Sequence, residues 1–76
     1  MLVFAIDNEL FIHDLDVISG GKLTVIDENK QLIKEIELQN DNFFCLTLNI
    51  PNGKYLIKLT SPDIEMEKKV IIKQPT

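Results

Sequence analysis

The sequence is poor in the residues that most specialised sites need. Among 76 residues there is no tryptophan and no arginine, and there is one cysteine, Cys45. A single cysteine excludes an internal disulfide and a cysteine-based metal site. Without tryptophan the chain lacks the aromatic platform on which proteins commonly stack sugars. The eight basic residues are all lysines and form no cluster that could replace the counterions of nucleic acid.

Long apolar runs are also missing. No stretch approaches the ~20 apolar residues of a membrane span. The apolar run within Met1–Asp7 is too short for the h-region of a signal peptide and lacks a basic n-region. The length allows one domain, residues 1–76, and folding would hide only ~60% of the surface of so short a chain. A deep, water-excluded catalytic cavity is therefore not expected.

Charge is distributed unevenly along the chain. The net charge is −4, and residues 1–21 contain four acids and no base, whereas the eight acids and eight lysines of residues 22–76 cancel. Net charge bears on solubility rather than on fold. We therefore expect the acidic first quarter to be a solvated face. The lack of a cluster of basic residues also disfavours binding to an anionic membrane surface.

Alternation of apolar and polar residues predicts an all-β fold. Turn residues interrupt the alternation every 8–12 positions, which is typical of small sandwiches. We expect seven short antiparallel strands in a single immunoglobulin-like β-sandwich. The last strand, residues 64–73, carries three lysines and should be a charged edge strand. The expected inward side chains are Leu2, Phe4, Ile6, Leu10, Ile12, Leu23, Val25, Leu32, Ile36, Leu38, Phe44, Leu46, Leu48, Tyr55, Ile57, Leu59, Met66, Val70 and Ile72.

Short polar segments predict the connections. Asp14–Ser19 is expected to be a loop in which Leu15 and Val17 tuck inward. Asp27–Lys30 should form a tight turn, with Asn29 as the residue best able to adopt a left-handed conformation.

Proline marks two further connections. Pro51–Gly53 is expected to close one strand and to start a hairpin. Ser61–Asp63 places proline where a type I turn favours it.

One segment admits a second interpretation. Residues 27–40 also fit an amphipathic helix capped by Asp27, with Leu32, Ile33 and Ile36 on one face. The helical stripe ends at Ile36, whereas the strand pattern continues to Leu38, so the strand is favoured. If the helix formed, the order hairpin, helix, hairpin would indicate a β-grasp fold.

The candidate catalytic and metal-binding residues are few. His13, Asp14 and Asp16 form the only compact cluster, and they offer fewer ligands than calcium or zinc requires. Cys45 could be a nucleophile only with His13, and it lacks the basic or helix-terminal setting that lowers a thiol pKa. We expect no catalytic residues, no metal and no cofactor.

Two phenylalanines are expected on the outside. Phe11 and Phe43 fall on the outward parity of their strands, and Cys45 is likewise opposite in parity to its core neighbours. These three residues form a candidate partner-binding patch, unless the rim of the sandwich covers them. A homodimer or another protein partner would suit a chain whose own core is so small.

Three segments resemble a group of Bacteroidetes proteins. Residues 22–33 are similar to its strand–turn–strand, residues 52–59 (Asn-Gly-Lys-Tyr-Leu-Ile-Lys-Leu) to its Gly-x-Tyr hairpin, and residues 67–73 to its closing lysine-rich strand. The pattern occurs in the C-terminal sorting domain of type IX secretion cargo. It also occurs in small secreted Bacteroides proteins of unknown function with an immunoglobulin-like sandwich. Residues 4–12 of this chain resemble the opening segment of those proteins as well.

The resemblance implies a secreted or cell-envelope module without catalytic residues. Together with the outward phenylalanines it predicts a domain that acts through protein–protein contacts. Two alternatives stay open: a sorting or accessory domain of a larger type IX cargo protein, and a small cytosolic β-grasp-like adaptor.

Overall fold

The computed structural model describes all residues, 1–76, as seven β-strands and no helix. The strands are β1 (Leu2–Ile6), β2 (Glu9–Ile18), β3 (Lys22–Ile26), β4 (Leu32–Glu37), β5 (Asp41–Thr47), β6 (Gly53–Thr60) and β7 (Glu65–Ile72). The all-β prediction is confirmed, and the helix considered for residues 27–40 is wrong because that segment contains β4. No helix is present that could cross a membrane.

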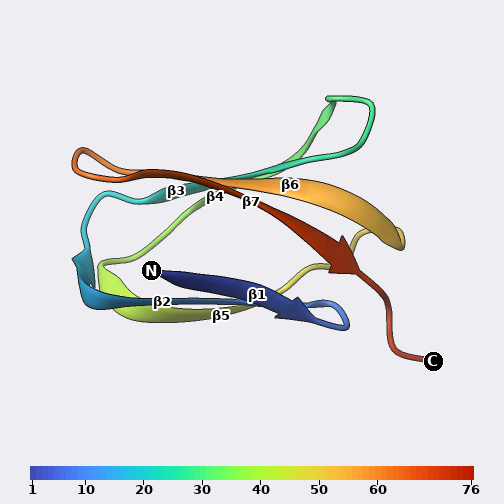
Figure 1. Ribbon diagram of the computed structural model, residues 1–76, viewed down its shortest axis with the longest axis horizontal. Helices are drawn as coiled ribbons and strands as arrows, with labels where there is room; N and C mark the ends of the chain where they lie inside the picture. The colour runs from blue at the N-terminus through green and yellow to red at the C-terminus, as the bar shows by residue number, and fades with distance from the viewer.

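The strands form two antiparallel sheets that pack face to face (Figure 1). One sheet has the order β1-β2-β5 and the other the order β4-β3-β6-β7. β4 pairs with β3, so it lies in the second sheet rather than beside β5 as in a constant-type immunoglobulin domain. The prediction that the last strand is an edge strand is confirmed, because β7 pairs only with β6.

The core lies between the two sheets and contains only apolar side chains and Tyr55. Strict alternation in β6 places Ile57 and Leu59 inward, opposite Val25 and Leu23 of β3. No polar side-chain atom is buried without a hydrogen-bond partner. The buried residues are Val3, Leu10, Ile12, Ile18, Leu23, Val25, Leu38, Phe44, Leu48, Ile50, Tyr55, Ile57, Leu59, Val70 and Ile72.

β1 has the opposite parity from the one predicted. Val3 pairs with Ile12 and faces inward, so Leu2, Phe4 and Ile6 point to the outer face of the three-stranded sheet. Every residue of β1 is apolar, so alternation alone could not distinguish its two faces. The register of β1 with β2 determines which face of β1 is buried.

Two further predictions of inward side chains are wrong. β2 continues to Ile18 through the segment expected to be a loop, and Leu15 and Val17 are exposed there. Leu32 is also exposed, because the β3–β4 hairpin rises away from the sandwich at its tip (Figure 1). Leu15 and Val17 keep the outward parity of β2, whereas Leu32 lies near the hairpin tip, beyond the area that the opposite sheet covers.

The turn after β3 is tight, as predicted, but the left-handed residue is Lys30 (φ 64°) and not Asn29. The Lys30 N–H donates to the Asp27 carbonyl at 3.0 Å, and the Asp27 N–H donates to the Gln31 carbonyl at 3.0 Å. The carboxylate of Asp27 accepts the N–H groups of Asn29 and Gln31, both at 2.9 Å. This closed network places the left-handed conformation one residue later than expected.

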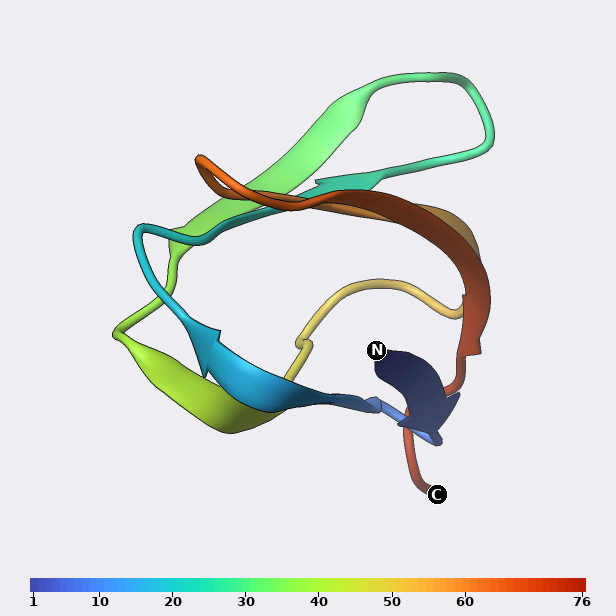
Figure 2. The same ribbon diagram turned by 60° about the vertical axis from the view of Figure 1, so that its left-hand side comes forward.

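The prediction that Pro51–Gly53 starts a hairpin is wrong. The segment after β5 is instead a connection between the two sheets. β5 pairs with β2, whereas β6 pairs with β3 and β7. Leu48 and Ile50 are buried on the way, so the connection closes one end of the core (Figure 2). The turn at Ser61–Asp63 does join a hairpin, β6–β7.

Tyr55 holds the β5–β6 connection in place. Its hydroxyl donates a hydrogen bond of 2.6 Å to the carbonyl of Pro51, four residues upstream. Immunoglobulin-like sandwiches commonly contain such a tyrosine corner near the start of the sixth strand. The contact gives the Gly-x-Tyr pattern of residues 53–55 a structural role in this chain.

Replacing Tyr55 with phenylalanine should lower the free energy of unfolding by about 1–2 kcal/mol, because a partly buried carbonyl loses its donor. Urea denaturation monitored by circular dichroism measures the change. A loss under about 0.3 kcal/mol would contradict a role for this hydrogen bond in stability.

Hydrogen bonds join the segments that follow β1 and β7, at one end of the sandwich. The Lys73 N–H donates to the carbonyl of Asp7 at 2.9 Å. Gln74 follows, and its side-chain amide donates to the carbonyls of Leu48 and Ile50, both at 2.8 Å. Its carbonyl oxygen accepts from the Asn8 amide at 3.0 Å. Gln74 thus joins the β1–β2 turn to the connection between the sheets.

Candidate functional site

The outer face of the three-stranded sheet has a regular arrangement of side chains. Alternation in β2 points Glu9, Phe11 and His13 outward, because Leu10 and Ile12 point into the core. The register places one residue of β1 and one of β5 beside each of them. We call this set the outer face; its three rows are Leu2, His13 and Phe43, then Phe4, Phe11 and Cys45, then Ile6, Glu9 and Thr47.

Contacts within the outer face hold its central aromatic side chains in place. The rings of Phe4 and Phe11 stack with centroids 5.1 Å apart, so Phe11 is only partly exposed. The ring of His13 meets Phe43 edge-on at 6.2 Å. Phe43 is 51% exposed. The face is therefore an ordered apolar surface and not a set of loose side chains.

The three residues predicted as a candidate patch lie together on this surface. Phe11 is the direct cross-strand neighbour of Cys45, and Phe43 lies two residues before Cys45 on the same side of β5. The rim of the sandwich does not cover Phe43 or Cys45. Leu2, Phe4 and Ile6, predicted to lie in the core, belong to the same surface.

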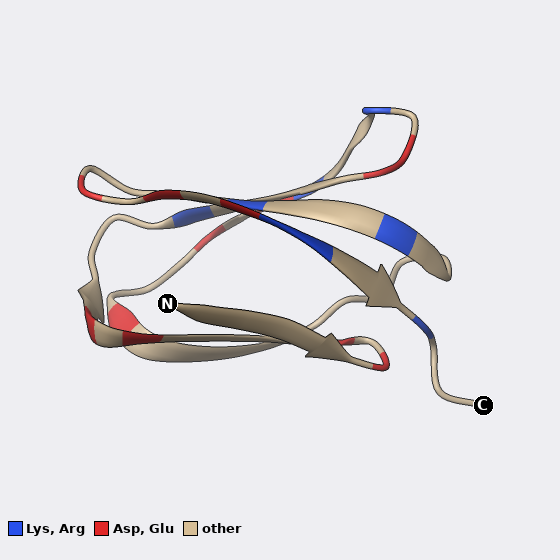
Figure 3. Ribbon diagram, in the orientation of Figure 1, with Lys and Arg blue, Asp and Glu red and all other residues tan.

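Exposed apolar side chains gather at this sheet. Seven of the ten large exposed hydrophobic side chains belong to it or lead into it. Leu15 is 91% exposed and, with Val17, continues the outward row of β2. Figure 3 shows that the charged residues of this sheet lie towards its ends, while its middle carries none. The seven residues are Met1, Leu2, Phe4, Ile6, Leu15, Val17 and Phe43.

Phe43 and its neighbour Phe44 provide a matched test of these assignments. Phe43→Ser should change the free energy of unfolding by less than about 1 kcal/mol, because the ring is on the outer face. Phe44→Ala should cost about 3 kcal/mol or more, because that ring is buried opposite Ile12. Chemical denaturation of both variants measures the difference; equal losses would contradict the assigned faces.

Cys45 has an unreactive setting. Its thiol donates to the Glu9 carboxylate at 3.3 Å. This hydrogen bond, with smaller contributions from desolvation and from the negative charge of Glu9, raises the pKa of Cys45. A raised pKa leaves less thiolate near neutral pH, which is the opposite of what nucleophilic catalysis needs.

Alkylation of Cys45 should therefore be slow for an exposed thiol. Glu9→Gln removes the negative charge, so the rate of iodoacetamide labelling at pH 8 should rise by a few-fold. Mass spectrometry of timed samples measures the rate, and Glu67→Gln on the other sheet is the control. An unchanged rate in Glu9→Gln would show that Glu9 does not suppress the thiolate.

The cluster around His13 has no metal-binding geometry. His13 faces outward beside Phe43, whereas Asp14 lies 3.9 Å from the amino terminus of Met1. No group of three or more histidine, cysteine or acidic side chains is arranged to hold a metal ion.

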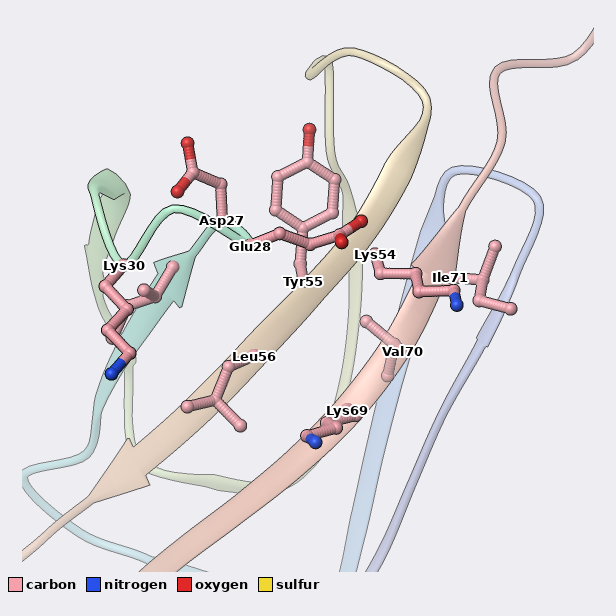
Figure 4. A pocket seen from close by; sticks show the side chains of 10 residues that line it. Asp27, Glu28, Lys30, Lys54, Tyr55, Leu56, Lys69, Val70 and Ile71 are labelled. Carbon is pink, nitrogen blue, oxygen red and sulfur yellow. The ribbon is translucent and has the colours of Figure 1, made fainter.

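A second surface lies on the opposite side of the molecule. The β3–β4 turn overhangs the outer face of the four-stranded sheet and forms a groove of about 550 Å³ (Figure 4). Ile26, Leu56 and Ile71 supply apolar surface. The ion pairs of this sheet, Lys22–Glu35 and Lys58–Glu67, lie outside the groove. The lining residues are Ile26, Asp27, Glu28, Lys30, Lys54, Tyr55, Leu56, Lys69, Val70 and Ile71.

The charges of the groove nearly balance. The lining contains three lysines, Lys30, Lys54 and Lys69, and two acids, Asp27 and Glu28. One carboxylate oxygen of Asp27, Oδ1, accepts two N–H groups of its own turn. The groove contains no histidine and no thiol. Its lining combines apolar side chains with side chains of both charges.

The fold and its surfaces define a small immunoglobulin-like β-sandwich with one apolar outer face. No protein-family model matches the chain, and comparison with curated proteins and with solved structures found no match.

Proposed function

We propose that this domain is a non-catalytic protein-interaction module that binds its partner through the outer face of the three-stranded sheet. The concentration of exposed apolar side chains on that face carries the proposal. Single exposed apolar side chains are normal on a protein surface, whereas exposed apolar side chains gathered on one face mark an interaction site. The stacked pair Phe4–Phe11 supplies the central aromatic anchor that such interfaces commonly use.

Site-specific photo-crosslinking tests the proposal. A photoreactive phenylalanine analogue at position 43 should give a discrete adduct in cells that express the chain. The same analogue at position 58, on the outer face of the other sheet, is the control and should give none. Phe11→Lys, combined with the position 43 probe, should abolish the adduct. Equal labelling at both positions, or labelling that survives Phe11→Lys, would contradict the proposal.

We also propose that the module acts outside the cytoplasm, as a secreted or cell-envelope protein. The support is the resemblance of residues 4–12, 22–33, 52–59 and 67–73 to secreted Bacteroides proteins. Fractionation of cells that express the complete reading frame tests this: a cytoplasmic location would contradict it. A fusion of residues 22–76 to a periplasmic reporter in a type IX-competent host separately tests the sorting alternative, which predicts export of the reporter.

A further inference from the structure

We infer that the partner of the outer face is a second copy of this chain. The inference rests on the proposed function and gives it a partner. The two copies pack face to face about a two-fold axis that lies in the interface and runs across the strands, along the row of Phe4, Phe11 and Cys45.

The placement of charge on the outer face selects this axis. Glu9 and His13 lie on β2 at equal distances on either side of Phe11, and they are the only ionisable side chains on the face apart from the Cys45 thiol. An axis along β2 would set Glu9 against Glu9 of the second copy. An axis across the strands sets Glu9 against His13 of the second copy, twice. Complementary pairs of this kind fix the register of an interface.

The apolar side chains are self-complementary about the same axis. Phe11 meets Phe11 of the second copy at the centre of the interface, where hot spots are usually found. Leu2 of one copy lies over Ile6 of the other, since both are on β1 and on opposite sides of the central row. Phe43 lies over Thr47 of the second copy in the same way. Within the three rows, no apolar side chain is set against a charge.

Sheet packing allows the approach. Two sheets stack face to face about 10 Å apart with their strands crossing at about 30°. At that spacing a glutamate and a histidine that point towards one another can make contact. The same spacing sets the Cα atoms of the two Cys45 residues too far apart for a disulfide, which needs less than about 7 Å.

The size of the face sets the expected affinity. Three strands about 4.8 Å apart and five residues of about 3.4 Å each cover roughly 240 Å² of flat sheet. The accessible area is larger than this flat area, because side chains project from the sheet and because Leu15 and Val17 lie beyond the three rows. The interface is nonetheless smaller than the ~800 Å² per partner of a standard complex. A dissociation constant in the micromolar range is therefore expected.

Charge reversal tests both the dimer and its axis. Glu9→Lys alone sets lysine against histidine, and His13→Glu alone sets glutamate against glutamate. Each single variant should weaken self-association at least tenfold, as measured by sedimentation equilibrium. An equimolar mixture of the two variants restores one Lys–Glu pair and one Glu–His pair in a heterodimer. The mixture should dimerise within about threefold of the unchanged chain.

Two further variants test the apolar centre of the interface independently of its charged pairs. Phe11→Lys should weaken self-association at least a hundredfold, because it places two lysines at the centre of the interface. Glu67→Lys, on the outer face of the other sheet, should leave self-association unchanged. Circular dichroism melts show whether each variant is folded, so that a loss of dimer is not confused with a loss of fold.

The outcomes distinguish the inference from the proposed function. If the unchanged chain is monomeric up to about 500 µM, well above a micromolar dissociation constant, the second-copy inference is overturned. The position 43 crosslink then decides the proposed function by itself. A dimer in which the mixture is no stronger than the single variants would overturn the axis. A dimer insensitive to Phe11→Lys would overturn both the inference and the proposed use of this face.

Discussion

Replacing Gln74 with alanine is expected to lower the free energy of unfolding by about 2–3 kcal/mol. Its side chain makes three hydrogen bonds, to Asn8, Leu48 and Ile50, and all three are partly buried. Each is worth about 1 kcal/mol, and more where a carbonyl is left without a donor. A domain of this length has a total stability of roughly 4–11 kcal/mol. One residue near the chain end therefore accounts for a large fraction of it.

Two variants serve as controls for Gln74→Ala. Gln74→Glu keeps an acceptor for Asn8 but cannot donate to the two carbonyls, so it should lose nearly as much stability as alanine. Thr76→Ala removes an exposed side chain two residues later and should be neutral. Guanidinium denaturation of all three measures the effect. If Gln74→Ala were as stable as Thr76→Ala, water would have to satisfy the carbonyls of Leu48 and Ile50.

The second large effect is expected in the centre of the four-stranded sheet. Ile57 is fully buried and pairs with Val25 on one side and Lys68 on the other. Ile57→Ala should cost about 3–4 kcal/mol, from lost transfer free energy and from the cavity that remains. In a chain with so small a core, a loss of this size is a large fraction of the free energy of unfolding.

Ile71 is a matched control, because it has the same side chain on the adjacent strand but is 66% exposed. Ile71→Ala should change stability by no more than about 0.5 kcal/mol. Ile57→Val, which removes one methylene group, should cost about 1 kcal/mol. Thermal unfolding would rank the three variants. Equal melting temperatures for Ile57→Ala and Ile71→Ala would contradict the assigned faces of β6 and β7.

The sequence predicted the strands well where polar residues separate the two faces. Three of the four outward residues of β6 after Gly53 are polar, Leu56 being the exception. The predicted core residues Tyr55, Ile57 and Leu59 are all buried. Prediction failed in β1, which is apolar on both faces, so that only pairing with β2 could decide. It also failed at Leu15, which points outward because β2 continues through the expected loop, and at Leu32, which lies near the tip of a hairpin that rises away from the sandwich.

Turn chemistry was predicted less well than strand position. The sequence shows that Asp27–Lys30 turns, but the Asp27 carboxylate and the bulge after Val25 together decide which residue becomes left-handed. Similarly, Pro51–Gly53 has the composition of a hairpin turn. The pairing of β6 with β3 and β7 depends on contacts between residues that are distant in sequence. The residues of the turn itself do not determine it.

Three of the nine residues of the outer face could be found from sequence. Phe11, Phe43 and Cys45 follow from parity in strands whose other side is plainly the core. Leu2, Phe4 and Ile6 could not be found that way, because they complete the patch only through the register of β1 with β2. An entirely apolar first strand is the signal that could have raised the question, since only one of its faces can be buried in a two-layer fold.

The Gln74 contacts have a mechanical consequence. β1 and β7 both end where Lys73 bonds to Asp7 and Gln74 bonds to Asn8, so the two strands run parallel. The amino and carboxyl ends of the chain therefore leave the sandwich in opposite directions (Figure 1). Tension applied between them would shear these bonds together instead of opening them one at a time. The rate of unfolding under load then depends on a few residues at one end of the domain.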